Sequence, residues 1–180
     1  MPPTPDPTDR DAIDARIRDL MASHAPLRET LAGLVRLVEE VTPSGMLGSI
    51  LILDESGKVL RHGAGPSLPE AYNAAVDGLV IGPDVGSCGT AAFQDRTVSV
   101  YDIANDGRWR SYRDLALQHG LRACWSTPIH GTRGTVLGTF ANYYRVVRDP
   151  SPVDLELTAR ITRAAAMAIE GARAAHTFDA

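Results

Sequence analysis

Cysteine is scarce in this sequence: Cys88 and Cys124 are the only two among 180 residues, with no C-x-x-C pair and no Cys/His set at zinc-ligand spacing. A disulfide framework and a metal site therefore have no support, although a redox pair stays open. Long apolar runs are also missing, since none approaches the roughly 20 residues that span a bilayer. The start of the chain is rich in Pro and Asp and does not resemble a secretory signal. We therefore predict a cytoplasmic protein with no membrane partner.

Clustered positive charge is absent as well. The chain has 18 Lys and Arg residues against 22 Asp and Glu residues, a formal net charge of −4, and no basic block. Because nucleic-acid surfaces concentrate Lys and Arg on one face, we predict no nucleic-acid partner. The apolar content of 44% and the charged content of 22% are those of an ordinary globular protein, and this length suits a single domain.

Helical periodicity marks both ends of the chain. Apolar residues recur at spacings of three and four within residues 9–42, which predicts two amphipathic helices. Residues 1–8, which are rich in proline, are predicted to form a disordered tail. A last helix is predicted over residues 151–176, with Ser151 as its cap and Pro152 in its first turn.

The middle of the chain, residues 43–150, carries strand and turn signals with short helices between them. Ser67 and Ser111 are predicted to cap two of these helices, and Gly120 to end the second. No βαβ alternation is present, so we predict an α+β fold with an antiparallel sheet. Its terminal helices would cover one face, and loops with short helices the other. The predicted strands are 48–53, 58–62, 78–81, 98–101, 123–129 and 135–143.

Four motifs in this middle region resemble those of the GAF domain, the small-molecule-binding module of signalling proteins. The resemblance covers residues 34–170 and implies a sheet of about six strands and dimerisation through the terminal helices. It also implies a ligand pocket covered by the loops and short helices between residues 63 and 119. The motifs are V-G-S-C-G-T-A-A at 85–92, V-S-V-Y-D-I at 98–103, G-L-R-A-C-W-S-T-P-I at 120–129 and the V-L-G-T-F-A-N-Y-Y run within 134–144.

The same resemblance limits the cofactors that we expect. The signature of cyclic-nucleotide-binding members and the arrangements that attach a bilin are both missing, so neither ligand is expected. Haem stays open, with His119 as the candidate axial ligand; a capping or surface role is the alternative for this residue. No output domain follows residue 175 in this sequence. We therefore expect the signal to stay within a homodimer or to pass to a separate kinase or other effector protein.

Candidate ligand-binding residues gather where the resemblance places the pocket. Aromatic rings offer stacking surface with a polar tip, although ordinary core packing is the alternative. The amides at the start of the helix near residue 88 suit a small anion, and Asp102 suits either a ligand hydrogen bond or an Asx turn. The predicted set is Cys88, Gly89, Thr90, Tyr101, Asp102, Trp109, Tyr112, Cys124, Trp125 and Ser126.

The two cysteines also raise an enzymatic alternative. The G-x-C-G-T-A run around Cys88 is similar to that of the GAF-fold free methionine sulfoxide reductases, and a helix N-terminus lowers the pKa of a thiol. That family uses further cysteines, and Cys124 lies in the wrong motif to replace them. We therefore predict a sensory domain with no catalytic residue. A thiol reductase and a ligand-free dimerisation module remain as alternatives.

Overall fold

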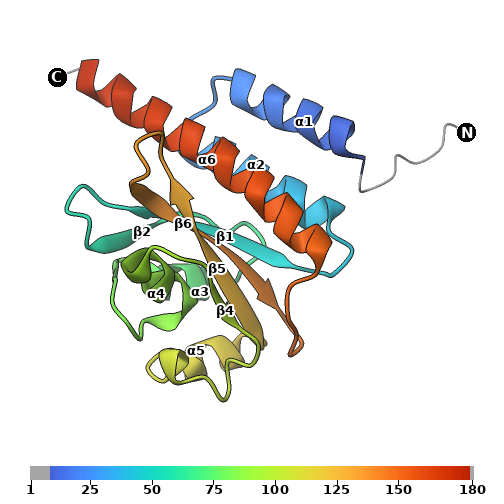
Figure 1. The fold of residues 1–180 in the computed structure, drawn as a ribbon, viewed down its shortest axis with the longest axis vertical. Coiled ribbons are helices and arrows are strands. Elements are labelled where there is room, and N and C mark those ends of the chain that lie inside the picture. The colour runs from blue at the N-terminus through green and yellow to red at the C-terminus, as the bar shows by residue number, and fades with distance from the viewer. Residues whose placement is uncertain (1–8, 179–180) are drawn as a thin grey trace, which may run out of the picture.

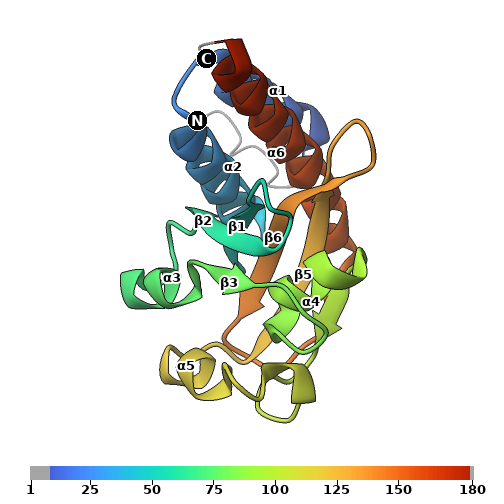
Figure 2. The same cartoon turned by 90° about the vertical axis from the view of Figure 1, so that its left-hand side faces the viewer.

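The computed structural model describes residues 9–178, so the predicted tail at residues 1–8 lies outside the described part. Helices α1, α2 and α6 cover one face of a central sheet, and the short helices α3, α4 and α5 lie on the other face (Figures 1 and 2). The helices are α1 (Arg10–Ala22), α2 (Leu27–Val41), α3 (Glu70–Val76), α4 (Gly86–Gln94), α5 (Arg113–Gln118) and α6 (Pro152–Phe178), with a 3-10 turn, η1, at Gly107–Trp109. The strands are β1 (Leu47–Leu53), β2 (Val59–Ala64), β3 (Leu79–Val80), β4 (Val98–Val100), β5 (Ala123–His130) and β6 (Val136–Tyr144).

The sheet has the strand order β3-β2-β1-β6-β5-β4, and every neighbouring pair is antiparallel. Hairpins join β1 to β2 and β5 to β6, while the central β1–β6 pairing brings the two halves of the chain together. This confirms the predicted α+β fold with a six-stranded antiparallel sheet. Within residues 9–178, no helix is both long and apolar enough to cross a membrane.

Alternation along the central strands sorts their side chains between two apolar cores. In the β5–β6 register, Cys124 is opposite Tyr143 and Trp125 is opposite Asn142. Because successive side chains on a strand point to opposite faces, each pair shares one face of the sheet. Cys124 and Tyr143 belong to the core under the short helices, whereas Trp125 belongs to the core under α2 and α6.

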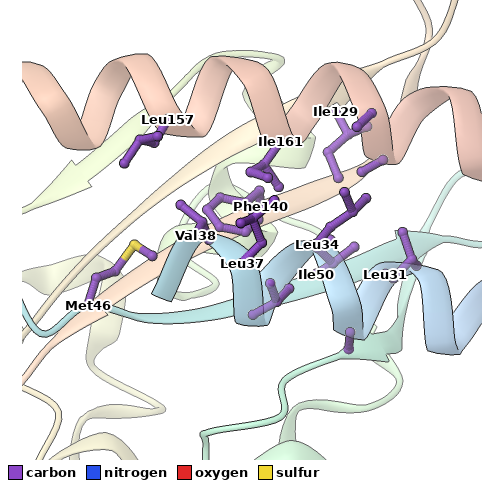
Figure 3. Close-up of a cluster of buried hydrophobic side chains, with 14 of the residues drawn as sticks. Leu31, Leu34, Leu37, Val38, Met46, Ile50, Ile129, Phe140, Leu157 and Ile161 are labelled. Carbon is purple, nitrogen blue, oxygen red and sulfur yellow. The ribbon is translucent and has the colours of Figure 1, made fainter. Parts of the chain in front are cut away.

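The core beneath the long helices fixes the sheet as a rigid platform. Leu34 and Val38 of α2 meet Phe140 of β6 and Ile161 of α6 in this layer (Figure 3). All four are almost fully buried, and complete burial of one such side chain stabilises the fold by about 1.5–3 kcal/mol.

The start of α6 has the predicted cap. The Ser151 amide donates to Asp154 Oδ2 at 3.0 Å, and the Asp154 amide donates back to Ser151 Oγ at 3.2 Å. Asp154 is buried and also accepts hydrogen bonds from Arg148 Nη2 and Ser44 Oγ, each at 3.1 Å. This carboxylate therefore ties the first turn of α6 to two neighbouring loops.

Two other predicted caps are wrong. Ser67 donates to the Glu39 carboxylate of α2, and α3 begins after Pro69 without a side-chain cap. Ser111 is exposed, because α5 begins one residue later than expected, with Tyr112 in the capping position. The predicted end of α5 is confirmed: Gly120 has a φ of +75°, which favours glycine, and its amide bonds to the Leu117 carbonyl.

Candidate functional site

A small cavity lies between the sheet and the layer of short helices. Its volume is about 20 Å³, which is room for about one water molecule. Four aromatic rings and four aliphatic side chains form most of the wall, and the first turn of α4 closes it. The lining residues are Leu51, Tyr72, Val76, Leu79, Val85, Gly86, Ser87, Cys88, Trp109, Tyr112 and Tyr143.

Two tyrosines form the polar part of this wall. Tyr72 of α3 donates from its hydroxyl to the hydroxyl of Tyr143 of β6 at 3.1 Å, and the two rings meet edge to face with centroids 5.6 Å apart. Burial raises the pKa of both hydroxyls well above the ordinary value of 10.0. Both groups are therefore neutral at physiological pH.

Trp109 links the outer loop to the sheet. Its Nε1 donates to Ser87 Oγ at 3.1 Å, and Ser87 Oγ donates to the carbonyl of Cys124 at 3.1 Å. Gly86 starts α4 with a φ of +58°, and its Cα faces the ring of Trp109. Two buried hydrogen bonds, both made by Ser87 of α4, therefore connect η1 and β5.

Cys88, Trp109 and Tyr112 are the predicted site residues that line the cavity. Cys124 and Ser126 are buried on the same side of the sheet but lie outside the lining. Both cysteines are free and buried, and desolvation raises the pKa of each thiol. The lowered pKa that the reductase alternative requires is therefore not found at Cys88, since neighbouring hydroxyls offset its burial only in part.

Gly89 and Thr90 serve the local structure of α4. This helix begins at Gly86, earlier than predicted, so the Gly89 amide is already bonded to the Val85 carbonyl. Thr90 Oγ1 accepts from the Val85 amide at 3.1 Å and donates to the Gly86 carbonyl at 2.5 Å. The Gly89 amide and the Thr90 hydroxyl therefore form hydrogen bonds within the start of α4. They do not face the cavity as the predicted anion site requires.

Three further candidates lie away from the cavity. Trp125 faces the long helices and packs against Tyr144, with ring centroids 5.6 Å apart, because alternation on β5 points it away from the cysteines. Tyr101 is 55% exposed. Asp102 accepts from the Ala104 amide and the Asn105 side chain at 3.1 and 2.6 Å, which is the Asx-turn alternative.

His119 lies beside the cavity wall. Its ring meets Tyr72 edge to face at 5.9 Å, and its Nε2 is buried with no hydrogen-bond partner among the described residues. A cavity of about 20 Å³ does not admit a porphyrin, so the residues in this conformation do not fit haem. In the described part of the chain, no group of three or more His, Cys, Asp or Glu residues has the geometry to hold a metal ion.

Sequence reasoning missed Tyr72 and Tyr143. Antiparallel pairing of the predicted strands 123–129 and 135–143 contained a usable signal for Tyr143, because its register opposite Cys124 places both side chains on the cavity face. Tyr72 offered no such signal, since a seven-residue helix does not reveal which of its sides faces the sheet.

A six-stranded antiparallel sheet with terminal helices on one face and a cavity under short helices on the other defines a small α+β domain of three layers. The sequence model of the GAF domain matches residues 24–170. The chain therefore belongs to the GAF domain family, as the four motifs predicted.

Individual relatives agree with this assignment. The methyl sulfide methyltransferase-associated sensor of Methanosarcina acetivorans is 38% identical over 160 residues, which are 89% of this chain and 16% of the relative. The chain thus spans about a sixth of the length of this curated relative.

Solved structures show the same fold at low sequence identity. The GAF domain of a phosphoenolpyruvate-protein phosphotransferase from Coxiella burnetii has a TM-score of 0.75 at 16% identity, with 92% of this chain and 95% of that chain covered. The free methionine-R-sulfoxide reductase from Neisseria meningitidis, solved with its substrate, has a TM-score of 0.67 at 15% identity, with 91% of each chain covered.

Proposed function

We propose that this GAF domain is a cytoplasmic sensor that binds a small molecule in the cavity between β6 and the short helices. Binding changes the packing of α1, α2 and α6, and the change is passed to a homodimer partner or to a separate effector protein. The observation that carries this proposal is a continuous set of contacts from the cavity to the first turn of α6.

These contacts begin where β6 ends. Tyr143 lines the cavity, and the next residue, Tyr144, packs against Trp125 on the helix side. The guanidinium of Arg148 lies 4.5 Å from the centre of the Tyr144 ring and bonds to Asp154, which caps α6. A displacement of β6 at Tyr143 therefore moves groups that hold the start of α6.

The small volume of the cavity defines the state described here as closed. A larger ligand requires movement of the segment 82–119, which includes α4, η1 and α5. Such a ligand shifts the equilibrium only if it binds the open arrangement more tightly than the closed one.

A groove between α1 and α6 is the proposed contact for the second copy of the chain. The two helices lie side by side in both views (Figures 1 and 2). Ile17, Met21 and Met167 line the groove, and Met167 is 64% exposed. Burying these side chains against another subunit removes apolar surface from water, which favours association.

The test combines binding with helix geometry. Purified protein is screened for ligands by native mass spectrometry, and spin labels on α6 report the distance between subunits with and without each ligand. The proposal predicts that a ligand perturbing Trp109 also changes the distance between α6 helices. A ligand that binds at Trp109 and leaves this distance unchanged contradicts the signalling part.

The reductase likeness supports a second candidate, thiol-dependent reduction of free methionine sulfoxide. The burial and raised pKa of Cys88 and Cys124 oppose it, because the thiolate is the nucleophile. Turnover of free methionine sulfoxide that is lost in both Cys88→Ser and Cys124→Ser would establish this activity. A third candidate, a dimerisation module without ligand, is supported by the nearly filled cavity. It predicts a dimer whose Trp109 no compound perturbs.

A further inference from the structure

We infer that the cavity selects an uncharged, compact ligand that carries a hydrogen-bond acceptor. This inference rests on the proposed function and specifies the chemistry of the same site. Three properties of the wall carry it: its lack of charged side chains, the hydrogen that its paired tyrosine hydroxyls leave unused, and its size.

The wall presents no ionic partner. None of its lining residues, all of which lie in the described part of the chain, is Asp, Glu, Lys, Arg or His. The tyrosine hydroxyls stay neutral because burial raises their pKa. An ion entering this space would lose its hydration and find no countercharge, which makes its burial strongly unfavourable. The α4 N-terminus offsets only a small part of that cost.

Three side-chain donors of the wall are already engaged in hydrogen bonds. Trp109 Nε1 donates to Ser87 Oγ, which in turn donates to the Cys124 carbonyl. The Tyr72 and Tyr143 hydroxyls share one hydrogen bond, which uses one of their two hydrogens. The second hydrogen has the thiols of Cys88 and Cys124 beside it, and sulfur is a weak acceptor. A good acceptor on a ligand can therefore bind this hydrogen, and the hydroxyl of the half-buried Tyr112 is a further donor in the lining.

The size of the cavity limits the ligand to a few heavy atoms. The closed volume of about 20 Å³ holds one water molecule. Tyr112 is half-buried, so movement of its ring enlarges the space without breaking a buried hydrogen bond described above. A planar molecule of four heavy atoms therefore matches the site better than a nucleotide or a tetrapyrrole.

Three probes of one shape separate these properties: acetone, acetate and 2-methylpropene. Acetone is neutral with one acceptor, acetate is charged, and 2-methylpropene has no acceptor. Binding is followed by NMR at the indole N–H of Trp109, and Trp125 in the opposite core is the internal control. We expect acetone to shift the Trp109 signal saturably, at millimolar concentration, with a Kd at least tenfold below that of acetate, and to leave Trp125 unchanged.

The role of the free hydroxyl is tested in the double variant Tyr72→Phe/Tyr143→Phe, since either hydroxyl alone still provides a donor. This change preserves both rings, and dispersed NMR signals verify its fold. We expect acetone binding to weaken about tenfold and 2-methylpropene binding to persist. Equal loss for both probes, or acetone binding unchanged, would overturn the assignment of the donor.

A parallel screen of larger charged and neutral compounds separates this inference from the proposed function. If acetate or another ion binds at Trp109 as tightly as its neutral counterpart, the ligand class inferred here is wrong and the sensor proposal stands. If neutral compounds alone bind there, both stand. If no compound of either kind shifts the Trp109 signal, both are overturned.

Discussion

Tyr143 and Tyr144 are consecutive residues of β6, yet their side chains belong to different layers of the molecule. The hydroxyl of Tyr143 meets that of Tyr72 at 3.1 Å in the cavity wall, while the ring of Tyr144 packs against Trp125 beneath the long helices. Strand alternation alone produces this arrangement. At this position of the sheet, a displacement of β6 in the cavity is transmitted directly to the helix side.

The first prediction concerns the anchor of α6. Asp154→Ala removes a buried carboxylate that caps the helix and accepts from Arg148 and Ser44. We expect the free energy of unfolding to fall by about 2–4 kcal/mol, because a cap and charged hydrogen bonds are lost together. Chemical denaturation measures this change. The control Glu40→Ala breaks an exposed ion pair and should change the free energy of unfolding far less; equal effects would contradict the role of Asp154.

Substitution of Ser87 is expected to destabilise the cavity wall. Ser87→Ala leaves the Trp109 N–H and the Cys124 carbonyl unpaired in a buried position. Each orphaned group costs about 1–3 kcal/mol, so the variant should be less stable by roughly 2–4 kcal/mol and should show altered Trp109 fluorescence. Ser99→Ala, on the exposed side of β4, is the matched control and should change neither property. A neutral effect of Ser87→Ala would mean that these two hydrogen bonds do not hold η1 in place.

The helices and strands could be predicted from the sequence wherever local residue patterns determine the structure. Ser151 and Pro152 marked the start of α6, and Gly131 and Gly134 in the loop between β5 and β6 suited a hairpin reversal. The residues that line the cavity were harder to predict, because they depend on which side of a short helix faces the sheet. Trp125 was assigned to the pocket from its position in a motif, although alternation with Cys124 already pointed it to the other core.

Alkaline pH should destabilise the domain through five buried acids. Tyr72, Tyr143, Tyr144, Cys88 and Cys124 all have a pKa raised by burial. Their stabilising effect is complete below the ordinary values of 9.0 for Cys and 10.0 for Tyr, and is lost as pH rises, because the unfolded chain releases protons first. We expect stability to be flat in this respect below about pH 8.5 and then to fall, by about 1.4 kcal/mol per pH unit for each group past its unfolded pKa.

The tyrosine share of that fall is measurable by substitution. Unfolding midpoints of Tyr72→Phe/Tyr143→Phe between pH 8 and 11 should fall less steeply than those of the unmodified protein. Tyr101→Phe, which alters an exposed ring, should follow the unmodified curve. Parallel curves for all three proteins would show that the buried hydroxyls do not control alkaline unfolding.

Thiol labelling should report the opening of the cavity. Both cysteines are buried with raised pKa, so iodoacetamide should modify the native protein at pH 8 at least tenfold more slowly than the unfolded chain. Cys88 lines the cavity and Cys124 lies behind it, so Cys88 should react first in Cys124→Ser and Cys88→Ser comparisons. Mass spectrometry quantifies each site. Rapid labelling of both native thiols would contradict the closed state.

Charge placed in the α1–α6 groove should prevent the proposed dimer. Met167 is 64% exposed beside Ile17 and Met21, so Met167→Asp would bury an unpaired carboxylate if this face met a second copy. We expect light scattering at tens of micromolar to give a dimer for the unmodified protein and a monomer for this variant. Phe93→Asp introduces the same charge at a 53% exposed position on α4, in the opposite layer, and should remain dimeric. Because both substitutions replace an exposed apolar side chain, a dimer lost only in Met167→Asp assigns the interface to the long helices. A monomeric unmodified protein contradicts the dimer outright, and dissociation by Phe93→Asp alone would move the interface to the short-helix layer.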